Sequence, residues 1–196
     1  VWSILTTAYT AIPVASFGEA FNHEPTFDAS IPGWVWAYDV PVGNLNYSAR
    51  LESEVTSAGV NWEMYISLDG SFQNFNWYSG TSDISGTNGK WILNAQPLNP
   101  IPALEIDWNR NDDGTTKDIK YTNVVPEDEN NGGNIFFQIT DGTVYNRLYE
   151  LYQKAEDNTI TIEWNKEKKN GRVKGLLLNS DSDYHCWGED LEDIDC

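Results

Sequence analysis

Alternation of apolar and polar residues with a period of two is the feature of this sequence that most restricts its fold. Between residues 45 and 56 the apolar side chains occupy one phase and the polar side chains occupy the other. Such alternation is typical of half-buried strands, and an Asp-Gly pair between two such segments indicates a hairpin. The pattern recurs, with turn-prone residues between the segments, at 60–69, 75–77, 91–93, 104–109, 119–121, 135–139 and 160–164.

These segments predict a mainly β fold with about eight or nine strands joined by short hairpins. The expected architecture is an antiparallel up-and-down meander that forms a barrel or a sandwich. One segment departs from the period of two, because Val144, Leu148 and Leu151 share a helical stripe. We therefore expect one helix near residues 143–155.

The first 18 residues contain no charged side chain, and Ile4, Leu5 and Ala8 lie on one stripe of a predicted short helix that ends near Pro13. The proline interrupts a run that is already short for crossing a bilayer, so no membrane span is expected. A length of 196 residues suits one domain. Its expected parts are an N-terminal segment packed on the core (1–40), a β-barrel or sandwich (41–180) and an acidic tail (181–196).

The charge balance excludes several classes of partner. Twelve Lys and Arg residues oppose 30 Asp and Glu residues, which gives a formal net charge of −18. Nucleic acids and anionic membrane surfaces require a cationic surface on the protein, so neither is an expected partner. The chain is also 40% hydrophobic and 13% aromatic, which excludes an acidic disordered protein.

The acidic tail concentrates this charge, since residues 181–196 hold seven carboxylates and no Lys or Arg. Cys186 and Cys196 predict a disulfide that closes the tail and favours an exported protein. The alternatives are two free thiols, or a zinc pair with His185. The tail is either a solvated surface or a calcium site, for which the candidate ligands are Asp181, Asp183, Glu189 and Asp190.

Just before this tail, five of the twelve cations lie within residues 166–174. The predicted hairpin there is either a solvated tip or a surface against which the acidic tail folds back.

Tryptophans supply the main candidate ligand site. Five of them lie on the apolar phase of separate predicted strands, where they either fill a core or line a cavity for a hydrophobic ligand. These five are Trp62, Trp77, Trp91, Trp108 and Trp164. Two more, Trp34 and Trp36, alternate outside that set and either stack on a sugar or cover the end of the barrel.

Tyr78, with two asparagines, is expected on the outward face of its strand.

Signatures of catalysis are weak. His23 and His185 are the only histidines, and neither belongs to a nucleophile or metalloprotease motif. Residues 109–114 match the first half of a calcium loop, but Lys120 replaces the closing glutamate, which favours a hairpin turn. No cofactor is expected apart from the possible calcium ion. Paired carboxylates of a polysaccharide hydrolase stay open, because their separation depends on tertiary structure.

Six short motifs from residue 45 onward form a recognisable set: Gly89–Asn94, Ile106–Arg110, Lys120–Asn123, Asn170–Lys174, Ser182–Trp187 and Asp193–Cys196. As a set they resemble a group of uncharacterised secreted proteins and lipoproteins of Bacteroidota bacteria. The resemblance implies export and a β-rich fold, and it implies no activity. Members typically carry an N-terminal lipid on a cysteine, and this chain has none there.

Together these features favour a non-catalytic binding protein that is secreted or located at the bacterial cell surface or periplasm. Its expected partner is a small hydrophobic molecule, a glycan or an envelope protein. The alternatives are a polysaccharide-acting hydrolase with paired carboxylates and a structural component of an envelope assembly.

Overall fold

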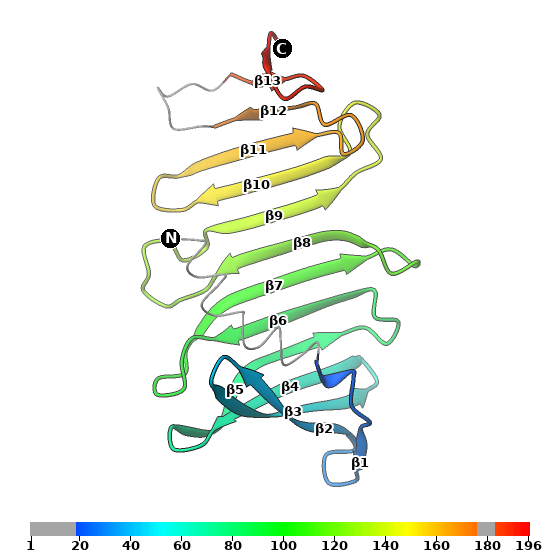
Figure 1. Ribbon diagram of the computed structural model, residues 1–196, viewed down its shortest axis with the longest axis vertical. Coiled ribbons are helices and arrows are strands. Elements are labelled where there is room, and N and C mark those ends of the chain that lie inside the picture. The colour runs from blue at the N-terminus through cyan, green and yellow to red at the C-terminus, as the bar shows by residue number, and fades with distance from the viewer. Residues whose placement is uncertain (1–18, 176–182) are drawn as a thin grey trace. The chain divides into compact units, whose positions relative to one another are not determined.

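Figure 1 shows the computed structural model of the chain, which describes residues 19–175 and 183–196. The described residues form 14 strands and almost no helix. The predicted N-terminal helix with Ile4, Leu5 and Ala8 lies outside them. The strands are β1 (Thr26–Asp28), β2 (Gly33–Val42), β3 (Leu45–Thr56), β4 (Gly59–Leu68), β5 (Phe72–Ser82), β6 (Asn88–Asn94), β7 (Pro102–Arg110), β8 (Thr116–Asn123), β9 (Asn134–Ile139), β10 (Arg147–Gln153), β11 (Asn158–Trp164), β12 (Gly171–Lys174), β13 (His185–Trp187) and β14 (Asp193–Ile194).

The strands follow one another in the sheet in the order of the sequence, with antiparallel pairing, so the predicted up-and-down meander is confirmed. β1 and β14 end this order, so the strands form one open sheet, and the predicted barrel or sandwich is wrong. Short hairpins determine which strands are neighbours. Closure also needs the first and last strands to pair with a matching tilt and stagger, which no local pattern encodes.

The described residues contain more strands than the eight or nine predicted. The stretch that carries Trp34 and Trp36 is strand β2 and pairs with β3 over ten residue pairs. Strands β1, β13 and β14 have three residues or fewer, which is too short for a periodic pattern to reveal.

The helix predicted near residues 143–155 is wrong, because this segment contains strand β10. Tyr149 lies between Phe137 of β9 and Ile162 of β11, and Leu151 occupies the next position on the same face. The apolar spacing of the segment fits a helix and a strand alike. Two neighbouring strands that pair with its backbone on both sides decide the outcome, as tertiary context overrides local propensity.

The chain divides into two compact units, Val1–Glu105 and Ile106–Cys196. In the first, strands β2–β6 place apolar side chains in rows across one face of the sheet. Leu51, Met64 and Ile66 are completely buried there. A fully buried side chain of this size contributes about 1.5–3 kcal/mol through removal of its surface from water. The central row is Trp36, Leu51, Met64, Tyr78 and Leu93.

Tyr78 belongs to this buried row, so its predicted outward position is wrong. A β-bulge explains the difference, because Met64 opposes Tyr78 while the next residue, Tyr65, opposes Asn76. Trp77 is therefore the extra residue of β5. Trp77 and Tyr78 are both buried although they are neighbours in the sequence. A bulge reverses the alternation along a strand, and the period-two prediction cannot anticipate it.

The second unit has no fully packed apolar core among its described residues, since all the buried hydrophobic side chains belong to the first unit. Its strands instead place half-buried apolar side chains along one face. The hairpin predicted at residues 109–114 is confirmed, because the Gly114 amide donates to the Asn111 carbonyl at 2.8 Å. The apolar face includes Ile119, Tyr121, Ile135, Phe137, Tyr149, Leu151, Ile160, Ile162 and Trp164.

Candidate functional site

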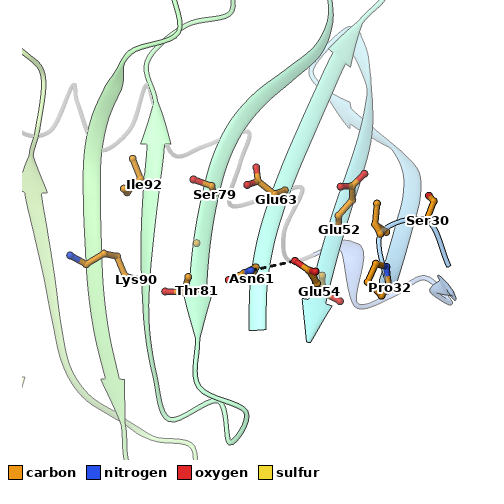
Figure 2. A pocket seen from close by; sticks show the side chains of 13 residues that line it. Ser30, Pro32, Glu52, Glu54, Asn61, Glu63, Ser79, Thr81, Lys90 and Ile92 are labelled. Carbon is orange, nitrogen blue, oxygen red and sulfur yellow. Dashed lines mark hydrogen bonds between the residues drawn. The ribbon is translucent and has the colours of Figure 1, made fainter. Parts of the chain in front are cut away.

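A polar groove of about 530 Å³ lies on the first unit, on the face of strands β3–β6 opposite the buried rows (Figure 2). Two rows of side chains, two residues apart along each strand, form its floor. The loop with Ser30, Ile31 and Pro32 forms the rim beyond β3. One row is Glu52, Glu63, Ser79 and Ile92, and the other is Glu54, Asn61, Thr81 and Lys90.

A two-residue turn builds this arrangement. Thr56 pairs with Gly59, so the turn contains only Ser57 and Ala58, and every pairing between β3 and β4 is fixed by it. Glu52 therefore lies opposite Glu63, and the whole polar phase of β3 faces that of β4. On the opposite face of these strands, Leu51 and Met64 are buried. A shift of the pairing by one residue would expose them, so their burial stabilises this register.

Each carboxylate on the floor has a polar partner. Glu52 forms an ion pair with Arg50, the residue two positions before it on the same strand face. Asn76 donates a hydrogen bond to Glu63, and Asn61 donates one to Glu54 at 3.4 Å. These contacts restrain the carboxylates of the floor.

The groove carries more negative than positive charge. Three glutamates line it, and Lys90 is the cation, itself paired with Glu105 at 3.0 Å. Carboxylates directly opposite one another destabilise a sheet. Glu52 and Glu63 are held in this arrangement despite that cost, which is typical of a site kept for binding or chemistry.

Burial raises the pKa of Glu63 above its ordinary value of 4.5, and the negative charge of Glu52 raises it further. The hydrogen bond from Asn76 acts in the opposite direction, because it favours the ionised carboxylate. Glu63 therefore holds its proton to a higher pH than an exposed glutamate does.

This pKa gives a prediction for stability against pH. Between the unfolded value near 4.5 and the raised native value, the native state binds a proton that the unfolded state has lost. The free energy of unfolding attributable to Glu63 must therefore fall as pH rises through this window. Urea denaturation of the wild type and of Glu63→Gln checks this. The free energy of unfolding of the variant, minus that of the wild type, should increase as pH rises through this window. A difference that stays constant with pH would contradict the raised pKa.

The tryptophans proposed as ligand contacts lie elsewhere. Trp34, Trp62 and Trp91 share one row with Gly80 between the last two, on the face opposite the groove. Trp62 contacts Trp36 and Trp91 at centroid distances of 6.1 and 6.3 Å. Trp77 packs against Phe75 at 5.1 Å. The structure thus brings Trp34, Trp62 and Trp91 into one row and Trp36 into the adjacent row. It places Trp77 in the core.

The other two belong to the second unit. Arg110 lies over the ring of Trp108 at 5.2 Å. Trp164 lines an apolar pocket with Trp187 of the tail.

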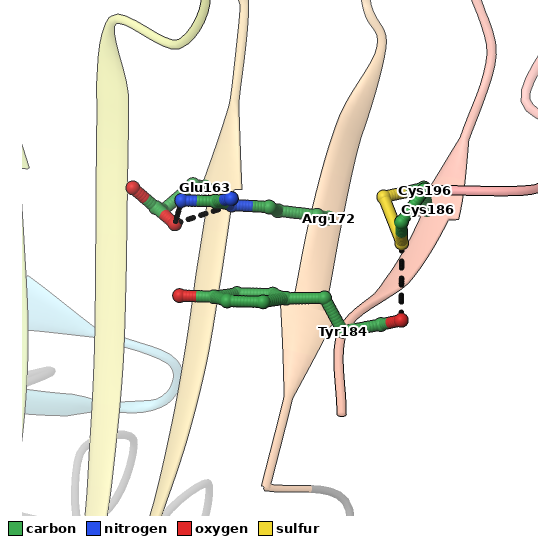
Figure 3. Close-up of a disulfide and its surroundings, with 5 residues drawn as sticks. All are labelled: Glu163, Arg172, Tyr184, Cys186 and Cys196. Carbon is green, nitrogen blue, oxygen red and sulfur yellow. Dashed lines mark hydrogen bonds and ion pairs between the residues drawn. A yellow bond between two sulfur atoms is a disulfide. The ribbon is translucent and has the colours of Figure 1, made fainter. Parts of the chain in front are cut away.

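The described part of the acidic tail lies against the preceding basic hairpin, which is one of the alternatives expected for it, because β13 pairs with β12. The predicted disulfide joins Cys186 to Cys196 with a Cα–Cα distance of 5.1 Å. Figure 3 shows the guanidinium of Arg172 stacked on the ring of Tyr184, with Glu163 at the end of the guanidinium, where it accepts a hydrogen bond from Nε at 2.7 Å. Cation–aromatic contacts and backbone pairing hold the described part of the tail.

Of the proposed calcium ligands, Asp181 lies outside the described residues. Asp183, Glu189 and Asp190 are exposed, and no described group of three or more acidic, histidine or cysteine side chains is arranged to hold a metal. His23 stacks on Tyr38 at 4.8 Å, and His185 is exposed on β13. No helix in the described part of the chain has the length and apolar character needed to cross a bilayer.

Four of the groove residues, Glu52, Glu54, Asn61 and Glu63, were predicted on the solvent-facing phase of their strands, with no role assigned. Glu105 is not part of the groove lining, but it contacts the groove through its ion pair with Lys90. The signal that identifies the groove is the two-residue turn, because it places two acids of successive strands face to face.

Comparisons of the chain with protein families, with curated proteins and with solved structures found no match.

Proposed function

We propose that this is a carbohydrate-binding protein and that its groove on β3–β6 holds a neutral glycan. The observation that carries the proposal is the pair of polar rows, which present carboxylate, amide, hydroxyl and ammonium groups within one groove of about 530 Å³. That volume lies within the range of small-ligand sites, about 300–1,000 Å³. The groups come from four paired strands and are therefore positioned rigidly.

The chemistry of the lining selects the ligand class. Carboxylates accept hydrogen bonds, and the amide of Asn61 donates them, whereas hydroxyls such as Thr81 do both. A sugar carries many hydroxyls that match both kinds of partner. Ile92 and the ring of Pro32 offer apolar contacts to the C–H faces of the sugar ring. Three carboxylates against one ammonium disfavour an anionic ligand, and the polar floor disfavours a wholly apolar one.

Binding is tested by isothermal titration calorimetry with neutral oligosaccharides that are first selected on a glycan array. Glu63→Ala and Asn61→Ala should each weaken binding, and Glu63→Ala by about 10- to 100-fold, because a hydrogen bond to a charged group contributes about 1.5–3 kcal/mol. Glu150→Ala is the matched control, since Glu150 is a half-buried glutamate of β10 in the second unit. The proposal fails if no neutral glycan binds, or if the control loses as much affinity as the groove variants.

The same groove supports a second candidate, a glycoside hydrolase. Residues directly opposite in an antiparallel pair have Cβ atoms about 4.5–5.5 Å apart, which suits the carboxylate separations of about 5–9.5 Å in such enzymes. Glu63, with its raised pKa, is suited to act as general acid, and Glu52, which contacts Arg50, is the second carboxylate of the pair. Release of reducing ends that Glu63→Gln abolishes, with binding retained, would favour the enzyme. Binding without release favours the carbohydrate-binding protein.

The disulfide supports an oxidising compartment for this function, either outside the cell or in the periplasm. Thiol alkylation of the protein taken directly from its native compartment, followed by mass spectrometry, tests this. Two unmodified cysteines that become reactive only after reduction support export, and two alkylated cysteines contradict it.

A further inference from the structure

The second unit contains an apolar pocket of about 660 Å³ beside the basic hairpin. Cross-strand pairing builds it. Tyr149 pairs with Ile162 on one row, and Trp164, Gly171 and Trp187 follow one another across three strands on the next. The lining residues are Tyr149, Ile162, Trp164, Lys166, Lys169, Trp187 and Leu191.

Gly171 makes room for one wall of this pocket. A Cβ atom at this position would lie 2.2 Å from Cζ2 of Trp187, so only glycine allows the indole to lie flat over the sheet. The indole Nε1 donates to the Lys169 carbonyl at 2.6 Å, which fixes the ring against the hairpin. The disulfide closes the tail one residue before Trp187. Trp187 is thus held in place by packing, a hydrogen bond and a covalent link.

The apolar surface around this pocket is incompletely covered. Leu191 is 65% exposed, in a turn in which its amide donates to the Gly188 carbonyl at 3.0 Å. Trp164, Trp187 and Ile162 are only half buried. An apolar ligand would remove these side chains from water, which is favourable in proportion to the area covered.

The charged groups that line the pocket are both cations, in a chain of net charge −18. Neither Lys166 nor Lys169 forms an ion pair with another described residue. The neighbouring Glu167 is instead engaged by the Asn146 amide at 2.7 Å. Two ammonium groups that pair with no acid of the described residues are therefore next to an apolar surface, and a ligand with an anionic head and an apolar body complements both.

We propose that this pocket binds a single-chain amphiphile with a carboxylate head, a long-chain fatty-acid anion. The chain covers Ile162, Trp164 and Leu191, and the carboxylate accepts from the ammonium groups of Lys166 and Lys169. The site is separate from the glycan groove and shares no residue with it.

Calorimetric titration of the full chain with dodecanoate, below the concentration at which it forms micelles and at physiological salt, tests the proposal. Dodecyltrimethylammonium supplies the same chain with a cationic head, and acetate supplies the head alone. Dodecanoate should bind at least about tenfold more tightly than either, because chain burial and head-group charge both contribute. Equal binding of the two dodecyl compounds, or no binding of dodecanoate, overturns the proposal.

Variants locate the site. Lys166→Gln/Lys169→Gln should weaken dodecanoate binding by about tenfold, since two exposed charge contacts are lost. The control Lys117→Gln/Lys154→Gln removes the same charge from exposed positions of the same unit and should leave binding unchanged.

Leu191→Ser, at an exposed position that contributes little to folding, should also weaken binding several-fold. Equal effects of the two lysine pairs, or no effect of Leu191→Ser, contradict the assignment. Glycan binding measured on the same variants should not change, so failure at one site is distinguishable from failure at the other.

Discussion

Leu51→Ala should lower the free energy of unfolding by about 2–5 kcal/mol, the range for aliphatic side chains truncated in a packed core. Leu51 has no exposed surface and lies between Trp36 and Met64 in the central row of the first unit. Removal of its side chain loses buried apolar area and leaves a cavity that these neighbours fill only partly. Because Glu52 follows on the opposite face of the same strand, loss of this packing also loosens the groove floor. Urea denaturation followed by tryptophan fluorescence measures the change.

Val55→Ala is the matched control for this experiment. Val55 lies on the same strand, but it is 59% exposed. Its truncation should change the free energy of unfolding by less than about 0.5 kcal/mol, as exposed substitutions do. If Leu51→Ala were no more destabilising than Val55→Ala, the row would not be the core that holds the groove.

Replacement of Cys186 and Cys196 by serine should destabilise the tail by about 3 kcal/mol, the loop-closure contribution of a ring this short. The cysteines are ten residues apart, and the ring encloses the turn that carries Leu191. Without the bond, the pairing of β13 with β14 depends on a two-residue strand. A change of 3 kcal/mol corresponds to about a 100-fold increase in local opening.

Amide hydrogen exchange measures this opening at Gly188, whose N–H donates to the Glu192 carbonyl at 2.9 Å inside the ring. Exchange there should accelerate about 100-fold, while the amides of β10 and β11 keep their rates. Dodecanoate binding should weaken in the same variant, since Trp187 is next to Cys186. Unchanged exchange at Gly188 would mean that the contacts of Tyr184 with Arg172 and of Trp187 with Lys169 hold the tail without the disulfide.

Much of the strand content was predictable because it is encoded locally. The alternation at residues 45–56 predicted β3 with the same bounds, and Asp113-Gly114 predicted the turn between β7 and β8. β10 was not predictable in this way. Leu148 and Leu151 fit a helical stripe, and only the strands on either side of Tyr149 show that the segment is extended.

The candidate groove was predictable only in part. The polar phase of β3 and β4 was evident, so Glu52, Glu54 and Glu63 were expected on the same side of the sheet. Their pairing was not, because a turn centred one residue later would place Glu54, not Glu52, opposite Glu63. Tryptophans were predicted as the ligand contacts because they carry the larger apolar surface, and four of the seven candidates lie on the face opposite the groove.

The sequence by itself determined the strand type, the in-and-out phase of most side chains and the antiparallel order. These properties follow from nearest-neighbour geometry, since a strand alternates its faces and a short turn returns the chain beside itself. Only the tertiary structure decided that the sheet stays open, that a bulge at Trp77 turns Tyr78 inward, and that Glu63 faces Glu52. Each of these depends on which residues meet across neighbouring strands. A periodic pattern specifies the face of the strand on which a side chain lies, but not the side chains that it meets there.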